Sequence, residues 1–305
     1  MTVEARAQRK SALAPAAAAT TGILVGVATV ATKSLVDQTG PASLALLRYS
    51  VGLLCLLPPT LLSDRRAFDR RDLPPIALLG IAQFGILIVL LNVGLQFIPS
   101  ARAALIFATT PLLTMILAAA LGFERLSLAQ TTGVLLTVVG VGLALGEKVI
   151  QRVRGPEAWV GELAVLGSAM IAAACSLLYR PYLRKYPALP LSALAMLAAV
   201  VFLAALAAGE GFFASPPGFG VAGWLAVLVI GVSSGVGYFL WLWALNNATP
   251  TRVAVFLALG PVTASGLGAL LLAEAISPLF LAGLACLVVG LWLAHLQVPA
   301  AGERW

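Results

Sequence analysis

Long apolar runs alternate along this chain with short segments that carry its charges and turn residues. A helix needs about 20 apolar residues to cross the hydrocarbon core of a bilayer. Each crossing segment must also pair its own backbone groups, and the strict alternation of a barrel strand is missing, so helices are predicted. The pattern therefore predicts an all-α polytopic membrane protein with ten spans, near residues 13–33, 41–63, 74–97, 101–122, 128–146, 159–179, 188–209, 219–245, 252–273 and 278–297.

The composition agrees with this pattern. Of the 305 residues, 61% are hydrophobic and only 10% are charged, whereas a soluble domain has about 25% charged residues. The net charge of +7 comes from basic residues scattered in short loops, without the basic stripe or stacking surface of a nucleic-acid-binding protein. We expect the lipid bilayer, and no nucleic acid, as a partner.

The loop charges predict the orientation of the spans. Cytoplasmic loops of membrane proteins carry an excess of Lys and Arg, and the largest basic clusters lie between spans two and three and between spans six and seven. Both loops share a side with the N-terminus. The N-terminal basic residues precede a small-residue cluster and then an apolar centre, the wrong order for a cleaved signal peptide. We expect a bacterial plasma (inner) membrane protein with both termini in the cytoplasm.

An internal repeat appears when the sequence is shifted by 150 residues. Small apolar residues could match by chance, but Arg, Pro and Glu also match in the same frame. Each half (1–155 and 156–305) holds five spans, an odd number, so the second half is predicted to insert upside down, as in secondary transporters with a central cavity at the midplane. A duplicated scaffold without transport is the alternative. The matched pairs are Gly85/Gly235, Leu95/Leu245, Arg102/Arg252, Ala108/Ala258, Pro111/Pro261, Glu124/Glu274, Ser127/Ser277, Gly133/Gly283 and Gly140/Gly290.

Nearly the whole chain resembles the drug/metabolite transporter superfamily, in its ten-helix EamA branch. The most specific parts are the paired stretches RAALIFATTPLLTMILAAALGFERLSLAQTTGVLLTVVGVGLAL and RVAVFLALGPVTASGLGALLLAEAISPLFLAGLACLVVGLWLA. Both carry the family's mid-helix Pro, a Glu that closes the span and a Gly-containing helix after it. The stretch LALLRYSVGLLCLLP looks like the family's second helix. Within the branch the chain is most similar to bacterial YddG-type amino-acid exporters, which implies free amino acids, aromatic and aliphatic ones included, as exported substrates.

Motifs for covalent or ATP-driven chemistry are missing. The sequence has no G-x-x-x-x-G-K-[ST] and no H-E-x-x-H, and its one G-x-S-x-G match, GVSSG at 231–235, lies inside a predicted span rather than at the strand-to-helix turn of a nucleophile elbow. Neither ATP binding by a P-loop nor hydrolytic catalysis is therefore indicated. The three cysteines lie in apolar runs without a CxxC pair, and His295 has no partners for a metal site. We expect no enzyme activity, no cofactor and no catalytic or metal-binding residues.

The paired prolines provide the first cavity candidates. Pro111 and Pro261 lie near the middle of spans four and nine. Each proline lacks a backbone N–H, so the carbonyls of Phe107 and Leu257 lose their helical partner and become available to a neighbour, a water or a ligand. Thr110 stands beside the first proline. A kink that serves only packing is the alternative for both positions.

Polar stripes on three spans provide the other cavity candidates. A helical angle count puts these side chains on narrow faces, where they line a cavity or form interhelical hydrogen-bonded seams. The stripes contain Asn92 and Gln96 on span three (with Gly85), Ser168 and Tyr179 on span six (with Ala172 and Cys175), and Ser234, Tyr238 and Trp241 on span eight.

Five further residues have structural and functional interpretations. Arg48 lies about two turns inside span two, where a charge marks a functional site by default, but the favoured prediction is that its long stem reaches outward to the interface. Glu124 and Glu274 are predicted to cap or anchor neighbouring helices. Gly22 and Gly26 predict close helix packing rather than gating.

These features predict a secondary transporter that exports small metabolites by alternating access. The alternatives are a drug or nucleoside exporter of the same superfamily and, from another class, a channel, which would need a polar or charged ring lining. On the predicted boundaries no carboxylate reaches the bilayer centre, and Glu162 is the most embedded. The expected energetics are therefore facilitated movement down the substrate gradient.

Overall fold

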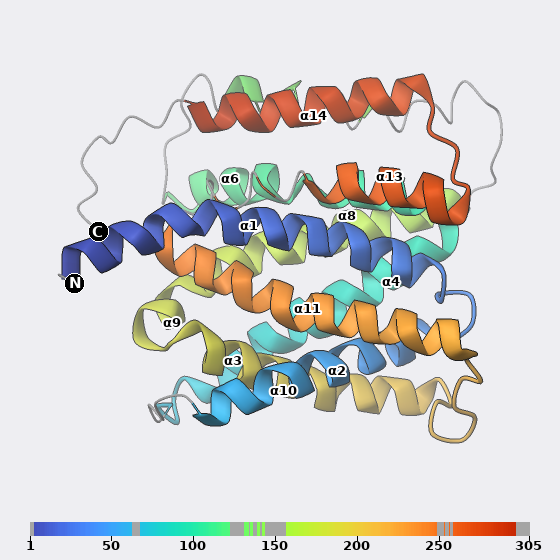
Figure 1. Ribbon diagram of the computed structural model, residues 1–305, viewed down its shortest axis with the longest axis horizontal. Helices are drawn as coiled ribbons and strands as arrows, with labels where there is room; N and C mark the ends of the chain where they lie inside the picture. Colours follow the sequence, from blue (N-terminus) through green and yellow to red (C-terminus); the bar gives the residue numbers. More distant parts are fainter. Residues whose placement is uncertain are drawn as a thin grey trace.

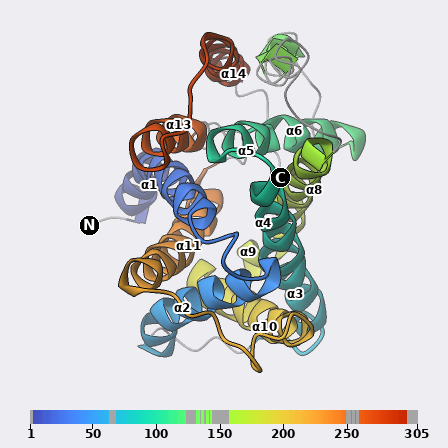
Figure 2. The ribbon, with the colours of Figure 1, turned by 90° about the vertical axis from the view of Figure 1, so that its right-hand side faces the viewer.

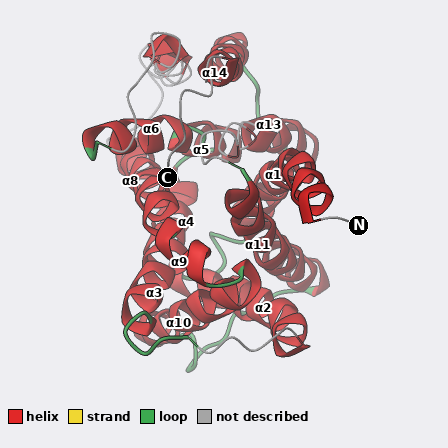
Figure 3. Cartoon of the chain, turned by 90° about the vertical axis from the view of Figure 1, so that its left-hand side faces the viewer, coloured by secondary structure: helices red, strands yellow, loops and turns green. Residues whose placement is uncertain are grey.

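The computed structural model describes residues 3–62, 68–122, 131–133, 135–136, 139–140, 142–143, 157–248, 253, 256 and 259–296. Every regular element in these ranges is a helix, as Figures 1 and 3 show. The fifth predicted span, 128–146, falls mostly outside the described residues.

The helices follow the predicted runs closely. In the first half they are α1 (Val3–Lys33), α2 (Pro41–Leu62), α3 (Leu73–Gly80), the π-helix η1 (Ile81–Ile86), α4 (Leu87–Phe97), α5 (Ser100–Phe107) and α6 (Thr110–Ala120). In the second half they are α8 (Glu157–Leu178), α9 (Arg180–Lys185), α10 (Ala188–Gly209), α11 (Val221–Asn247), α13 (Leu259–Leu272) and α14 (Pro278–Leu296).

Seven of the described helical segments are long and apolar enough to cross a membrane. They confirm the predicted spans one to four and six to eight, two of which are interrupted: η1 joins α3 to α4, and a break at Ala108 and Thr109 separates α5 from α6. Of the ninth predicted run, the structure describes α13, Leu259–Leu272, while most of residues 252–258 lie outside the described residues. The tenth run forms α14.

The helices form a ring when viewed end-on (Figure 2). In this ring α1 packs against α11 and α13, α2 against α10 and α11, α4 and α6 against α8, and α5 against α13. The helices of the first half therefore pack mainly on those of the second half. Helix α14 lies outside the ring (Figure 2) and contacts α5 through Phe280 and Leu287.

Glycines allow several of these helices to approach at backbone distance. A Cβ atom placed on Gly26 of α1 would lie 2.6 Å from the carbonyl oxygen of Gly260 on α13, and Gly22 is similarly close to Phe256. A Cβ on Gly235 of α11 would lie 2.7 Å from the carbonyl oxygen of Gly52 on α2. The predicted packing role of Gly22 and Gly26 is confirmed.

Two glutamates of the second half cap the N-termini of helices in the first half. The carboxylate of Glu274 accepts hydrogen bonds from the Ser100 N–H (2.9 Å), the Ser100 hydroxyl (2.7 Å) and the Ala101 N–H (3.3 Å). Glu210 accepts hydrogen bonds from the first backbone N–H groups of α2. A carboxylate at this position satisfies orphan N–H groups and the positive end of the helix dipole. The capping role predicted for Glu274 is confirmed, whereas Glu124 lies outside the described residues.

Large apolar side chains cover the outside of the ring. On α11, Leu225, Leu228 and Val232 are each 43–56% exposed, while Ser233 and Ser234 face inward and are buried. Apolar side chains outside and small polar ones inside are the arrangement expected when lipid is the surrounding solvent. The interior polar positions therefore mark where a ligand could bind.

Candidate substrate cavity

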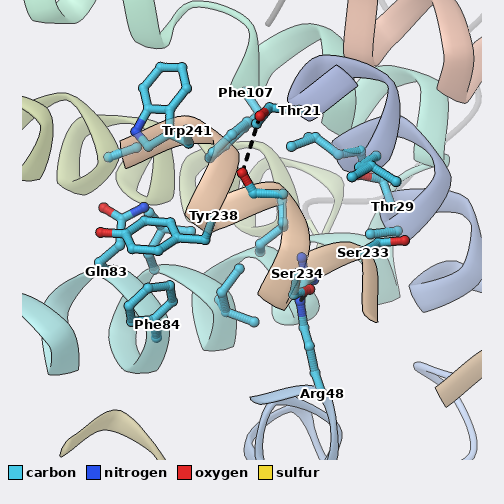
Figure 4. Close-up of a pocket in the computed structure, with 18 of the residues that line it drawn as sticks. Thr21, Thr29, Arg48, Gln83, Phe84, Phe107, Ser233, Ser234, Tyr238 and Trp241 are labelled. Carbon is cyan, nitrogen blue, oxygen red and sulfur yellow. Dashed lines mark hydrogen bonds between the residues drawn. The ribbon is translucent and has the colours of Figure 1, made fainter. Parts of the chain in front are cut away.

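A cavity lies inside the ring, between α1, α2, η1, α4, α5, α8 and α11 (Figure 4). It holds about 100 Å³ of space for water-sized spheres, room for about seven to ten waters at about 10–15 Å³ each. That is the scale of a small metabolite. Its polar lining consists of Thr21, Thr29, Arg48, Gln83, Thr110, Ser176, Ser233 and Ser234, beside the aromatic side chains of Tyr49, Phe84, Phe107, Tyr238 and Trp241.

Two irregular helical segments border the cavity. Helix α5 ends at Phe107 and α6 starts at Thr110, one residue before Pro111, which has no N–H to continue the ladder. The Phe107 carbonyl instead accepts a hydrogen bond of 2.6 Å from the Thr110 hydroxyl. On the opposite span η1 brings Gln83 and Phe84 to the cavity, and π-turns of this kind are frequent at functional sites.

Aromatic rings form one wall. The ring centroid of Phe84 lies 4.9 Å from that of Tyr49 and 4.2 Å from that of Tyr238, both in edge-to-face contact. Tyr179 continues the series behind Tyr238, at 6.3 Å. Such pairs are rigid and bury large apolar areas, so this wall suits an apolar or aromatic group.

Arg48 extends from α2 into the cavity and ends beside Ser234 of α11 (Figure 4). Its Nε donates a hydrogen bond of 2.5 Å to the Ser234 hydroxyl, and only 9% of the residue is exposed. The prediction that the stem reaches outward is therefore wrong. The reason is that α11 offers a polar partner in the interior, and the cavity holds the guanidinium.

Five of the twelve sequence-predicted candidates line this cavity. They are Phe107, Thr110, Ser234, Tyr238 and Trp241. They come from α5, α6 and α11, so both halves of the chain contribute candidates to one space. Their proximity shows a shared lining, and their contact with a substrate stays a prediction.

The other described candidates lie beside the cavity or away from it. Asn92 and Gln96 donate their side-chain amides to the carbonyls of Pro41 and Val36, at 2.8 and 3.4 Å, and so form an interhelical seam. The Ser168 hydroxyl donates to the Val165 carbonyl within α8. Three more candidates are buried but do not line the cavity: Pro111, Tyr179 and Pro261. Leu257 lies outside the described residues.

Several lining residues were not singled out from the sequence. Thr21 and Thr29 lie on one face of α1, two turns apart, and the Thr21 hydroxyl donates to the Gly237 carbonyl on α11 at 3.1 Å. Gln83, Ser176 and Ser233 complete the polar lining. The available signal was the spacing of Thr21 and Thr29, since residues eight apart lie near one face of a helix, although Thr20 and Thr32 lie in the same span.

The lining fits reversible binding rather than covalent chemistry. None of the described residues that line the cavity is Asp, Glu, His or Cys. Within the described part of the chain no cluster of three or more His, Cys, Asp or Glu side chains could hold a metal ion. Hydroxyls, one amide, one guanidinium and aromatic faces remain, which are groups that bind and orient a ligand.

Comparison with known proteins assigns the class. The EamA-like transporter family matches this chain twice, over residues 13–146 and 159–296. The chain therefore belongs to the EamA-like transporter family: it is a multi-pass membrane protein that transports small molecules, and the family is not one of enzymes. The two matches cover the two halves of the sequence repeat and indicate a duplicated unit.

Two curated relatives share most of their length with it. A protein of Streptantibioticus cattleyicolor named "Probable terminal-alkyne amino-acid exporter" is 30% identical over 262 residues, 85% of each chain. An "Uncharacterized transporter" of Archaeoglobus fulgidus is 25% identical over 269 residues, 88% of this chain and 93% of the relative. One solved crystal structure superposes with a TM-score of 0.69 at 22% identity, covering 92% of this chain and 95% of the other, and shows a shared fold.

Proposed function

We propose that this protein exports free amino acids with apolar side chains across a bacterial plasma membrane by alternating access. The observation that supports this most is the cavity itself, lined by both halves of a duplicated chain, with an aromatic wall and a few polar groups. The relative named as an amino-acid exporter supports the substrate class.

In this proposal the halves 1–155 and 156–305 are inverted five-helix repeats with both termini in the cytoplasm. The cavity lies near the midplane, because Thr21, Phe84, Phe107 and Ser234 all fall near the middle of their spans. Movement of one half against the other would expose it to each side in turn. Within a core of side chains from both halves, several helices approach one another at glycines, where small rotations would be easiest.

The proposed energetics are facilitated movement down the amino-acid gradient. No described residue that lines the cavity is a carboxylate or histidine that could exchange a proton there. Glu162 is buried at 5% exposure, but it lies outside the lining, with its carboxylate 3.7 Å from the Arg102 guanidinium. With equal substrate on both sides of a liposome membrane, an imposed pH gradient should cause no net accumulation. Proton-driven accumulation that Glu162→Gln abolishes would contradict this.

The test of function is counterflow in liposomes. Purified protein is reconstituted, the lumen is loaded with unlabelled leucine or phenylalanine, and entry of the labelled amino acid is followed. We expect transient accumulation that depends on the internal substrate, as a carrier requires. Unsaturable flux without such trans-stimulation would indicate a channel, and exchange of nucleosides or drugs in place of amino acids would indicate the other exporter class.

Two adjacent positions of α11 give a matched pair for this test. Ser233 is 7% exposed and lines the cavity, while Val232 is 43% exposed and faces outward. Ser233→Phe should fill the cavity and abolish counterflow. Val232→Phe adds a ring on the outer face and should leave it nearly unchanged. Equal activity of the two variants would show that the substrate does not pass through this cavity.

A further inference from the structure

Arg48 is a buried cation without a carboxylate partner in the described part of the chain. Its described contacts are the Nε hydrogen bond to Ser234 and the Tyr49 side chain, whose hydroxyl interacts with the guanidinium and whose ring centroid lies 5.5 Å from the guanidinium carbon. The other basic side chains described in the interior do have oxygen partners. Lys33 donates to the Leu95 carbonyl at 2.6 Å, and Arg102 lies 3.7 Å from the Glu162 carboxylate.

A charge in this position needs an anion. Ionisable groups inside membrane proteins pair with opposite charges or dipoles, because desolvation of an isolated charge is unfavourable. The cavity lining offers hydroxyls and aromatic faces to Arg48 but no anionic side chain. An anionic ligand would complete the site.

Ser234 fixes the orientation of the guanidinium. Its hydroxyl donates to the Ile230 carbonyl at 2.6 Å and therefore presents a lone pair to Arg48 Nε. Besides Ser234, the guanidinium has the neutral Tyr49 side chain beside it, and no described carboxylate contacts its terminal nitrogens. The planar fork of a guanidinium matches the two oxygens of a carboxylate.

We propose that Arg48 is the carboxylate-binding residue of the cavity and that Ser234 is its positioning residue, so that the substrate carries one carboxylate and an apolar body. This rests on the proposed function and names the chemical group that the site recognises. The edge-to-face rings of Phe84 and Tyr238 lie across the cavity for the apolar body (Figure 4). One guanidinium balances one negative charge, so dianions such as phosphate esters are disfavoured, and cationic compounds are repelled.

Binding of a matched acid and amide tests the site apart from transport. The full-length protein in detergent is heated with 3-phenylpropionate or with the neutral 3-phenylpropanamide, which has the same shape. A ligand that binds the native state raises the unfolding midpoint with its concentration. We expect the acid to act at a concentration at least about tenfold lower than the amide, because charge-assisted hydrogen bonds are about twice as strong as neutral ones.

Variants assign this preference to named residues. Arg48→Gln should abolish the difference between acid and amide, and Arg48→Lys should keep a weakened form of it. Lys33→Gln, which removes a positive charge outside the cavity lining, should keep it fully. If Arg48→Gln does not fold, Ser234→Ala replaces it: this variant should lower the acid preference, and Ser234→Thr, which keeps a hydroxyl, should restore it.

The outcomes separate this inference from the proposed function. Equal stabilisation by acid and amide, no stabilisation by the acid, or an unchanged preference in Arg48→Gln or Ser234→Ala overturns the carboxylate site. A wild-type protein that prefers the acid but exchanges no amino acid retains the site and overturns amino-acid export.

Discussion

Replacement of Glu274 by Gln should destabilise the protein measurably, although the residue lies outside the cavity. The Glu274 carboxylate accepts three hydrogen bonds from Ser100 and Ala101, at 2.7–3.3 Å, and so joins the end of α13 to the start of α5. Glutamine keeps the shape and one acceptor oxygen, but it loses the charge and turns an NH₂ group toward N–H donors. Loss of a cap costs about 0.5–2 kcal/mol, and the charge at the helix N-terminus adds roughly 0.3–1 kcal/mol.

We therefore expect a loss of about 1–2 kcal/mol. For a chain of this size that corresponds to roughly 2–4 °C in the unfolding midpoint. The assay is thermal unfolding of the purified protein in one detergent at one heating rate, because unfolding of membrane proteins is often irreversible and scan-rate-dependent. Asp37→Asn is the matched control, since Asp37 is exposed and its side chain makes no hydrogen bond or ion pair with the described residues.

The double variant Glu274→Gln with Ser100→Ala checks the mechanism. If the two residues act as one cap, the combined loss is smaller than the sum of the single losses, because contacting residues are not additive. A midpoint for Glu274→Gln equal to that of Asp37→Asn would refute the reasoning, and strict additivity would show that the Glu274 carboxylate and the Ser100 hydroxyl do not act together.

Three further predictions concern topology, the helix break and a partly buried carboxylate outside the spans. In a chain without its native cysteines, Ser215→Cys should react with an impermeant thiol reagent in intact cells, whereas reaction at Ala67→Cys with protection at Ser215→Cys would reverse the orientation. Pro111→Ala restores an N–H beside the α5–α6 break and should lower counterflow several-fold at normal folded yield, so full activity would leave only a packing role. The hydroxyl of Tyr186, together with Lys185, lowers the pKa of Asp72 below its ordinary value of 3.8, so Asp72 stabilises the fold at neutral pH and this contribution is lost as the pH falls through the lowered pKa. In Tyr186→Phe the contribution should be smaller and its loss on acidification should be complete at a higher pH, and an unchanged acid-unfolding curve would contradict this assignment.

The helices were predictable because each span must satisfy its own backbone hydrogen bonds. Run length and turn residues alone therefore place α2 and α10 within one residue of their observed ends. The glutamate cap was also predictable, since a carboxylate just after a span can reach only helix ends and loops. The repeat at a shift of 150 residues also predicted that the chain consists of two related halves.

The cavity lining was only partly predictable. The stripe through Gly85, Asn92 and Gln96 assumed an uninterrupted helix of 3.6 residues per turn, but η1 at Ile81–Ile86 widens one turn and shifts the register. Gly85 packs against Phe202, and the amide of Asn92 binds the Pro41 carbonyl. A helical angle count also cannot tell a seam from a cavity, because both use small polar side chains.

The direction of the Arg48 side chain shows a second limit. Its partner Ser234 lies 186 positions away in the sequence, on a helix whose rotation is set by glycine contacts with α2. No local pattern around Arg48 contains that information. The tertiary contact between α2 and α11 decides whether the guanidinium lies inside or at the interface.

The glycine crossings between the two halves have a mechanical consequence. At Gly26 on α13 and at Gly52 on Gly235, the helix backbones approach closely, with the Thr263 Cβ and the Met196 sulfur beside them, so each crossing can serve as a fulcrum for tilting. Helix α2 continues from Gly52 to Leu62, a lever arm of roughly 15 Å at 1.5 Å per residue. A tilt of roughly 10° would therefore displace the tip by roughly 2.6 Å while the fulcrum stays in place. A displacement of that size is close to the diameter of one water molecule, so modest tilts about these points would change the width of an opening at the ends of the helices.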